Sequence, residues 1–485
     1  MKEIKSKSLK NNFVFQVLYQ IIILVLPMLT APYLTRTLST TDLGTYTYVN
    51  SIAFYFVLIS NLGISQYGQR LFSNFKSEKE EVRKKFWSLY YVHFITTIFS
   101  TIMYITFALF VFKNNKIIFL IQTIYVLSAL FDVTWFFYGI QNFLNVVIVN
   151  FVFKILYTLS IFLFIKNPED INLYVILSSL VVFVPNFFNF VYAIIHYGYI
   201  KIEKKYCLIH IKPLLILSLA EFASALYTVF DKTIIGLYMK KDEVAYYDYA
   251  NKILAIPKSL INVVGIVFFP KVCSLVSANR EDEAKKLRNF SIELVTFLSI
   301  GSIYGLFLIS DKFVSWYYGI EFIKSSEYLK IMIPLIYVIL LGDIFRRQCL
   351  IPHHKDTIYI ISLFISGFLN LLLNFIFVKK YGVIGVIISS IAAEFCGTVF
   401  QWYFSRKYVT NFVVFKTFVF FMIIGSVMIL PIKLLNNVIT NNFVFVLVSI
   451  IVGGIIYSLI SLLYFLKLSS NKELFSIKLN HLFRR

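Results

Sequence analysis

About fourteen long apolar stretches follow one another through nearly the whole of this 485-residue chain. Each is about 20 residues or longer, which at 1.5 Å of rise per residue is enough to cross roughly 30 Å of hydrocarbon as an α-helix. The backbone inside a bilayer must satisfy its own polar groups, so helices are the expected structure. The stretches lie near residues 12–37, 43–70, 86–112, 117–140, 143–166, 171–200, 213–238, 243–275, 291–317, 325–351, 356–378, 382–405, 414–436 and 442–466.

The composition agrees with a membrane protein, since 59% of the residues are hydrophobic and only 15% are charged. Soluble domains of ordinary size cannot hide that much apolar surface from water. No connection between the stretches exceeds about fifteen residues, which is too short for a folded soluble domain. Residues 73–85 and 277–289, rich in Lys, Arg and Glu, are expected to be solvated loops. The sequence therefore predicts an all-α polytopic membrane protein with about fourteen transmembrane helices.

The net charge of +21 would suggest a nucleic-acid partner in a soluble protein, but its distribution has a simpler explanation. If the N-terminus is cytoplasmic, the connections on that side carry about three times as many Lys and Arg residues as the connections on the other side. This asymmetry satisfies the positive-inside rule. We therefore expect both termini in the cytoplasm and no nucleic-acid partner.

Residue types that bind metals are scattered along the chain. His353 and His354 are adjacent and are not four residues apart, so they do not share one face of a helix. The four cysteines have no C-x-x-C spacing and predict neither a disulfide framework nor a zinc site. We expect no metal and no cofactor, apart from a possible coupling ion, H⁺ or Na⁺. The cysteines are Cys207, Cys273, Cys349 and Cys396.

The chain also matches itself at an offset of about six spans, which indicates an internal duplication. Six is an even number, so the two halves enter the membrane in the same orientation. We predict an N-terminal lobe of residues 1–208, a C-terminal lobe of residues 209–408, and two further spans with a cytoplasmic tail in residues 409–485. Two such lobes normally enclose a cavity that opens alternately to each side. The matching segments are residues 46–52 with 247–253, 162–166 with 375–379, and 175–180 with 386–391.

Several motifs between residues 26 and 394 resemble the Wzx-type polysaccharide flippases of the multidrug/oligosaccharidyl-lipid/polysaccharide exporter superfamily. The chain departs from the family at Val244, where glycine is usual. The resemblance implies export of an undecaprenyl-pyrophosphate-linked oligosaccharide across the bacterial plasma membrane, for capsule or O-antigen. It also implies membrane lipids, a polysaccharide polymerase and assembly proteins as partners. The motifs are Leu26-Pro27, residues 31–38, Gly44-Thr45-Tyr46, residues 231–236, residues 245–250, Phe269-Pro270, residues 370–375, residues 381–385 and residues 392–394.

Charged residues at membrane depth are the candidate site, because each is costly in hydrocarbon and is usually paired or faces water. Lys258 is the leading candidate for binding the substrate phosphate, because it follows the helix-kinking Pro257 and lacks an acidic neighbour on the adjoining span. The other cationic candidates are Lys252, Arg36, Lys154 and Lys232. The acidic candidates, for ion coupling or for structural pairs, are Glu221, Asp231, Asp132 and Glu394.

Structural explanations for these charges stay open. Asp132 and Lys154 lie at similar depth on neighbouring spans and could form an ion pair. Glu221 and Lys232 are eleven residues apart, so a continuous helix would place them on one face. Arg346 and Arg347 end the tenth span and are explained by the positive-inside rule.

Two other functions compete with the flippase hypothesis. A proton- or sodium-coupled drug antiporter could use the same fold, although such proteins usually have twelve spans and the cationic set favours an anionic substrate. A membrane polysaccharide polymerase or ligase would need a large outer loop, and the sequence has neither that loop nor a recognisable enzyme motif. We therefore expect a transporter and not an enzyme.

Overall fold

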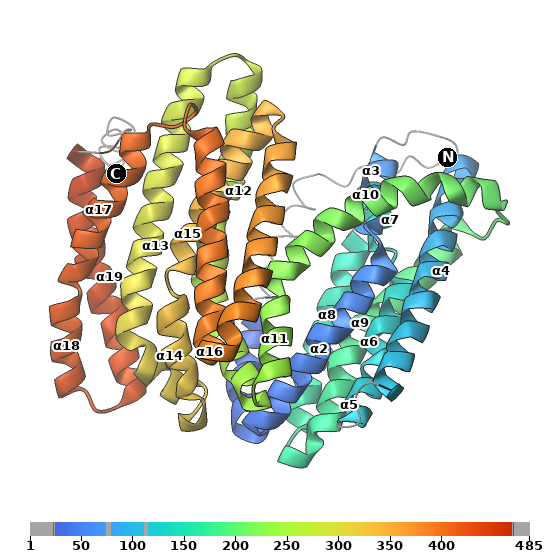
Figure 1. Ribbon diagram of the computed structural model, residues 1–485, viewed down its shortest axis with the longest axis horizontal. Helices are drawn as coiled ribbons and strands as arrows, with labels where there is room; N and C mark the ends of the chain where they lie inside the picture. The colour runs from blue at the N-terminus through green and yellow to red at the C-terminus, as the bar shows by residue number, and fades with distance from the viewer. Residues whose placement is uncertain are drawn as a thin grey trace. The chain divides into compact units, whose positions relative to one another are not determined.

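The computed structural model describes residue 23 and residues 25–73, 79–110, 115–142, 144–467 and 469. Helices dominate this part of the chain, and it contains no β-strand. Eleven of its helical stretches are long and apolar enough to cross a membrane, which confirms the predicted polytopic all-α fold. The chain divides into two compact units, residues 1–245 (unit 1) and residues 246–485 (unit 2). Figure 1 shows the helices of each unit. The predicted boundaries at residues 208 and 408 follow the repeat and stay a prediction.

Unit 1 begins with helical residues 25–37 and continues through a series of helices, several of them broken. The elements are α2 (Thr40–Asn61), α3 (Ile64–Ser73), α4 (Lys79–Phe110), α5 (Lys116–Ile121), α6 (Thr123–Ser128), η1 (Ala129–Phe131), α7 (Thr134–Gly139), α8 (Leu144–Phe164), η2 (Pro168–Asp170), α9 (Ile171–Tyr197), α10 (Lys204–Thr228), α11 (Phe230–Tyr238) and the start of α12 (Lys241–Ser277).

The first turns of α2 and α12 are held together by polar contacts. Ser39 caps α2 by accepting a hydrogen bond from the backbone N–H of Asp42 at 3.1 Å. Asp242 accepts hydrogen bonds from the hydroxyls of Thr40, at 3.1 Å, and Thr41. Gly44 allows this approach, because a Cβ atom there would stand 1.8 Å from the carbonyl oxygen of Lys241.

An aromatic cluster forms the core of unit 1 near α3, α4 and α7. Trp135, Phe136 and Phe137 of α7 are fully buried in it, together with Phe72 and Phe86. Gly68 of α3 faces Trp135 so closely that a Cβ atom would meet its ring at 2.5 Å. Packing of these rings stabilises the unit, since each aromatic side chain buries about 150–250 Å².

Unit 2 is also built of helices. Its elements are most of α12, then α13 (Glu281–Tyr317), η3 (Ile320–Phe322), α14 (Lys324–Met332), α15 (Leu335–Ile344), η4 (Phe345–Leu350), η5 (Ile351–His353), α16 (Asp356–Ser405), α17 (Asn411–Val427), α18 (Ile429–Val438) and α19 (Asn442–Lys467). The element η4 is a π-helix. The last helices pack on α13, where Phe421, Tyr457 and Tyr464 belong to one apolar core.

The 50-residue α16 is a hairpin of two helical limbs. Gly382 has a φ of 59° and a ψ of −137°, a left-handed backbone that interrupts the helix. Across the hairpin, Asn370 donates a hydrogen bond to the Ser390 hydroxyl at 3.1 Å, and Gln401 donates to Ser362 at 2.8 Å. The two limbs therefore correspond to the expected spans near 356–378 and 382–405.

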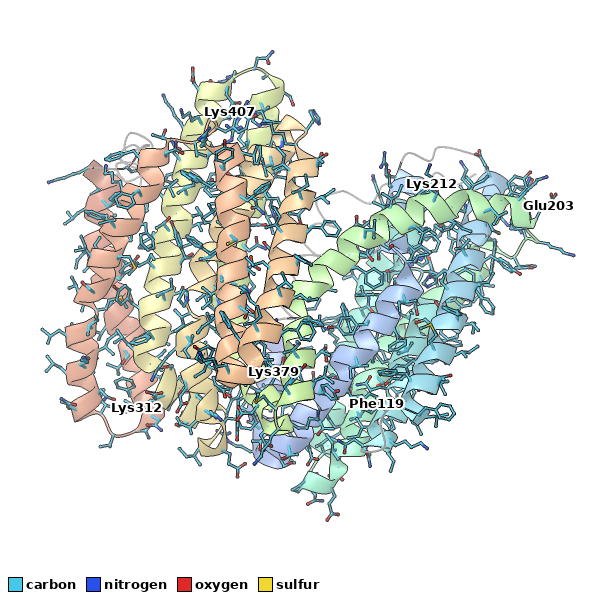
Figure 2. All side chains as sticks on the ribbon, viewed as in Figure 1. Phe119, Glu203, Lys212, Lys312, Lys379 and Lys407 are labelled. Carbon is cyan, nitrogen blue, oxygen red and sulfur yellow. The ribbon has the colours of Figure 1, made fainter. Side chains whose placement is uncertain are left out.

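Two expected spans are not among the eleven stretches. The first begins within residues 1–22, which lie outside the described residues, and the seventh is divided between α10 and α11. Large apolar side chains such as Phe110, Ile195 and Phe368 are exposed along the helices, as expected for surfaces that contact lipid. Charged side chains gather toward helix ends, with Lys407 at one end of unit 2 and Lys312 and Lys379 toward the other (Figure 2).

Candidate functional site

Lys258, the leading candidate from the sequence, lies on α12 in unit 2 and is half-buried. No ion pair within 4.0 Å involves its ammonium group in the described part of the chain, and Glu394 of α16 acts on it electrostatically. The sequence placed these two charges on distant spans and did not bring them together. Lys258, Asn262 and Gly265 recur at intervals of four and three residues, so they share one face of α12.

The other cations proposed as binding residues have varied surroundings. Lys252 forms an ion pair with Asp248 at 3.0 Å, one helical turn earlier, and lies over the ring of Tyr249. Arg36 is exposed, and Lys232 is half-buried beside the buried Asp231. Their roles in binding stay predictions.

The ion pair considered as one explanation for Asp132 and Lys154 is not formed in the described part of the chain. Asp132 accepts hydrogen bonds from the backbone and hydroxyl of Thr134, at 2.9 and 2.6 Å. The carboxylate therefore caps α7, because a helix begins with backbone N–H groups that lack partners. Lys154 is half-buried on α8 and forms no ion pair with any described residue.

Glu221 and Lys232 do not share one helical face as expected. The helix is interrupted at Val229, whose φ of −118° separates α10 from α11. The Glu221 carboxylate lies near the backbone of Gly63, at the break between α2 and α3. The sequence did not indicate this position beside a helix break, and the proposed part of Glu221 in ion coupling stays a prediction.

A charged cluster on the tenth span was not identified from the sequence. Asp343 of α15 forms ion pairs with Arg346 and with Arg347 Nε, the latter at 2.8 Å. Arg346 also donates a hydrogen bond to the Tyr359 hydroxyl of α16 at 3.2 Å. The spacing of three and four residues could have indicated the pairs, because such residues face each other on a helix. We call Asp343, Arg346 and Arg347 the arginine cluster.

Arg288 of α13 supports the π-helix that carries the two arginines. Its side chain is fully buried. Its Nε donates a hydrogen bond to the Gln348 carbonyl oxygen at 2.7 Å, and its Nη1 donates to Glu281 and to the Tyr408 carbonyl oxygen. Pro352 stands four residues after Gln348 and has no backbone N–H to donate, so the guanidinium supplies a donor to the Gln348 carbonyl. The sequence placed Arg288 in a solvated loop, and this prediction was wrong.

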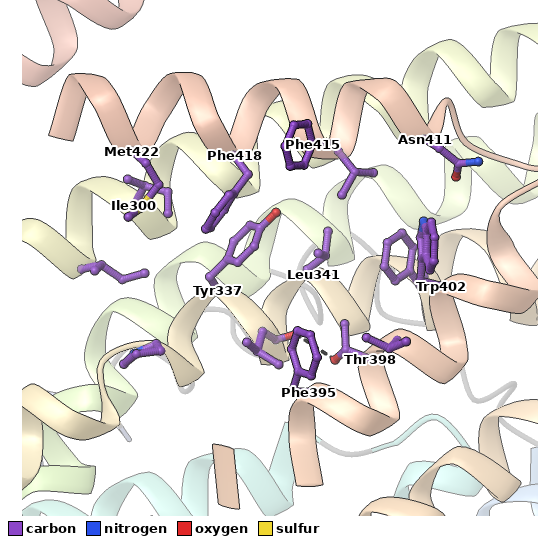
Figure 3. A pocket seen from close by; sticks show the side chains of 16 residues that line it. Ile300, Tyr337, Leu341, Phe395, Thr398, Trp402, Asn411, Phe415, Phe418 and Met422 are labelled. Atoms are coloured by element: carbon purple, nitrogen blue, oxygen red, sulfur yellow. Dashed lines mark hydrogen bonds between the residues drawn. The ribbon is translucent and has the colours of Figure 1, made fainter. Parts of the chain in front are cut away.

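An apolar cavity of about 560 Å³ lies between α13, α15, α16 and α17. Figure 3 shows Tyr337, Phe395, Phe415 and Phe418 turned toward its interior. No charged residue is among the described residues that line it, so the cavity suits a hydrocarbon chain and not a sugar or a phosphate. The lining residues are Ile300, Ile303, Pro334, Tyr337, Val338, Leu341, Phe345, Phe395, Thr398, Val399, Trp402, Asn411, Val414, Phe415, Phe418 and Met422.

The cavity and the arginine cluster lie on different sides of the same helix. Leu341 and Phe345 line the cavity and share a face, because they are four residues apart. Asp343 is two residues from each and therefore points the other way, toward Gly265, where a Cβ atom would stand 3.5 Å from its carboxylate. Unit 2 thus presents an apolar space and a cationic group that could each receive part of an amphipathic molecule.

A family model described as polysaccharide biosynthesis protein matches residues 9–276, more than half of the chain. A putative O-antigen transporter of Shigella dysenteriae is 23% identical over 372 residues, which cover 76% of this chain and 92% of that protein. A putative O-antigen transporter of Escherichia coli K12 is 22% identical, with 80% and 94% covered. The solved structure of the lipid II flippase MurJ in an inward closed conformation has a TM-score of 0.77 at 20% identity, and covers 93% of this chain and 99% of its own.

Proposed function

Because the chain belongs to the polysaccharide biosynthesis protein family, we propose that it is a flippase for lipid-linked oligosaccharides. The single observation that carries the proposal is the similarity to the two putative O-antigen transporters, which extends over most of both chains. These relatives are named as transporters, so we infer transport rather than catalysis. The similarity in fold to the MurJ structure is consistent with this function.

The proposed substrate is an oligosaccharide repeat unit linked through a diphosphate to undecaprenol. A charged diphosphate and a hydrated glycan cannot cross about 30 Å of hydrocarbon unaided, because a charge at the centre of a bilayer costs several kcal/mol or more. The protein must replace water around the head group with its own polar side chains. Lys258 and the arginine cluster supply cations for the diphosphate, and the apolar cavity suits the polyprenyl tail.

Alternating access of two like-oriented lobes is the proposed mechanism, with transfer from the inner to the outer leaflet of the bacterial plasma membrane. The excess of basic residues on one side of the predicted topology supports cytoplasmic termini. Coupling to H⁺ or Na⁺ through Glu221 or Glu394 belongs to the same proposal, as does cooperation with a polysaccharide polymerase and assembly proteins.

Deletion of the gene tests the function in cells. We expect lipid-linked repeat units to accumulate in the inner leaflet and surface polysaccharide to fall, with both effects reversed by the wild-type gene. Export of normal polysaccharide by the deletion strain, with no rise in lipid-linked intermediates, would contradict the proposal. Resistance to cationic drugs, lost on deletion while polysaccharide stays normal, would favour the antiporter instead.

A further inference from the structure

The arginine cluster carries more positive charge than its single carboxylate can balance. Asp343 lies between two guanidinium groups, so the three side chains have a net charge of +1. The exposed fractions of their side chains are 15% for Asp343, 24% for Arg346 and 26% for Arg347. A partly buried cation without a full counter-charge is costly unless it serves a purpose, and a bound anion removes this cost.

Arg347 has hydrogen-bond donors to spare. Its Nε lies 2.8 Å from Asp343 Oδ2, but this carboxylate oxygen accepts no hydrogen bond of good geometry from any described residue. The two terminal nitrogens of Arg347 form no hydrogen bond with any residue that the structure describes. Arginine presents five N–H groups in a planar fork that matches phosphate oxygens. The Arg347 fork is therefore available to a ligand.

On the side that faces α12, the arginine cluster is bordered by small or polar residues. Gly265 contributes no side chain, and the buried Asn262 Oδ1 accepts no hydrogen bond from the described part of the chain. Tyr359 lies on the other side, with its ring 5.0 Å from the Arg346 guanidinium. Lys258 lies one turn from Asn262 on the same face of α12. The arginine cluster therefore faces a small polar region of α12 around Asn262 and Gly265, and Lys258 lies on the same face, two turns before Gly265.

The backbone under the cluster is held in place. Arg346 and Arg347 belong to the π-helix, and such helices occur frequently at functional sites. The fully buried Arg288 binds the Gln348 carbonyl oxygen of this π-helix at 2.7 Å. A further, buried arginine thus fixes the turn, and the two ligand-facing arginines do not have to order it themselves.

We propose that Arg346 and Arg347 bind the diphosphate of the lipid-linked substrate, with Asp343 holding them when the site is empty. The proposal rests on the proposed function and names the residues of its head-group site. Two guanidinium groups match two phosphates, and charge-assisted contacts of this kind are stronger than neutral hydrogen bonds. On binding, phosphate oxygens replace the Asp343 carboxylate as partners of Arg347.

Binding of farnesyl diphosphate to the full chain in nanodiscs of zwitterionic lipid tests the proposal. We expect the Arg347→Gln variant to raise the dissociation constant at least about tenfold. Arg347→Lys keeps the positive charge but lacks the planar guanidinium, so it should cause an intermediate loss of affinity. Asp343→Asn removes the competing carboxylate and should tighten binding by about threefold. Arg280→Gln is the matched control, because Arg280 forms an exposed ion pair with Glu283 within one helical turn.

A purely structural ion pair makes a different prediction. In that case both Arg347→Gln and Asp343→Asn lower the melting temperature and leave the dissociation constant unchanged, which would overturn the proposal. If Arg347→Gln does not fold, Arg347→Lys and Asp343→Asn decide, because they are expected to change affinity in opposite directions. The proposed function is tested separately by gene deletion, so an unchanged affinity in folded variants would remove the site and leave the function standing.

Changing the lipid tests whether the arginine cluster binds the substrate diphosphate or a phospholipid head group. The same titration in nanodiscs with phosphatidylglycerol should give a similar affinity for farnesyl diphosphate, because one phosphodiester satisfies only part of the cluster. Complete loss of binding in these nanodiscs would identify a phospholipid head-group site and contradict the assignment to the substrate. Farnesol, which lacks phosphate, should bind wild type and Arg347→Gln equally.

Discussion

Units 1 and 2 use their polar side chains in different ways. In unit 1, His210 lies between the hydroxyls of Tyr67 and Ser88, each at 2.9 Å, and Asp132 caps a helix. These groups join helices and have their partners within the unit. In unit 2, Asp343 is shared by two arginines and Lys258 has no ion pair in the described residues. Lys154 of unit 1 also has no ion pair in the described residues, so the difference lies in the arginine cluster, whose donors in unit 2 are available to a ligand.

The largest expected effect comes from removing the buried support of the arginine cluster. Arg288→Met should lower the free energy of unfolding by about 4 kcal/mol, because it removes the buried donor to Glu281 Oε1 and to two backbone carbonyls. Chemical unfolding of the purified protein in detergent measures this loss of free energy. Arg280→Met is the control and should cost less than about 1 kcal/mol, since Arg280 is exposed. Equal losses would show that Arg288 is not a structural anchor of unit 2.

Gly44→Ala tests the packing of unit 1 and should cost about 3 kcal/mol. The new Cβ atom would lie 1.8 Å from a backbone carbonyl oxygen, which cannot move aside as a flexible side chain can. Gly305→Ala in α13 of unit 2 is the matched control, because no described atom lies within 4 Å of its Cβ position. At position 305, alanine should leave the free energy of unfolding unchanged or raise it by about 0.5–1 kcal/mol. The same unfolding measurement compares the two, and an unaffected Gly44→Ala protein would refute the close approach of α2 and α12.

Lys258 and Lys154 allow the two units to be compared through transport. Lys258→Gln should lower the transport rate by about tenfold, equivalent to about 1.4 kcal/mol, because it removes a half-buried cation that has no ion pair in the described residues. Lys154→Gln should lower the rate less than Lys258→Gln does, if the cations that bind the diphosphate lie in unit 2 as proposed. Surface polysaccharide in complemented deletion strains gives the rates. A larger loss for Lys154→Gln would reverse the assignment of cations to unit 2.

The smallest expected effect is a loss of stability at low pH that arises from His210 in unit 1. Burial lowers the pKa of His210 below its ordinary value of 6.5, and the nearby Lys85 acts in the same direction. The neutral ring is therefore favoured in the folded state, so this contribution to stability is full above about pH 6.5 and is lost as the pH falls below it. Melting temperatures between about pH 7.5 and 5.5 measure the decline. His210→Gln should flatten it, and an unchanged slope would exclude His210 as its source.

The fold was largely predictable because hydrophobic length is a local property of the sequence. The apolar stretches near 356–378 and 382–405 were placed correctly, even though the structure joins them through Gly382 into one hairpin. Breaks within a stretch were not predictable. The interruption at Val229 depends on packing around it, and it invalidated the expected common face of Glu221 and Lys232.

The candidate site was less predictable because contacts between distant spans decide it. Depth alone suggested Asp132 as a partner for Lys154, whereas a nearby helix terminus binds the carboxylate. Arg346 and Arg347 fitted the positive-inside rule, and only the three-dimensional contacts with Asp343 and Tyr359 distinguished them from other terminal cations. The π-helix beneath them has no recognisable signature in the sequence.

Reconstituted transport tests the central claim that cations of unit 2 carry the substrate diphosphate. Liposomes containing the protein, a fluorescent polyprenyl-diphosphate sugar and a leaflet-selective quencher report the rate of transfer. The account predicts that Arg346→Gln combined with Arg347→Gln lowers this rate to below about one tenth of wild type, whereas Arg280→Gln stays within about twofold. A double variant that folds and transfers the sugar at the wild-type rate would contradict it.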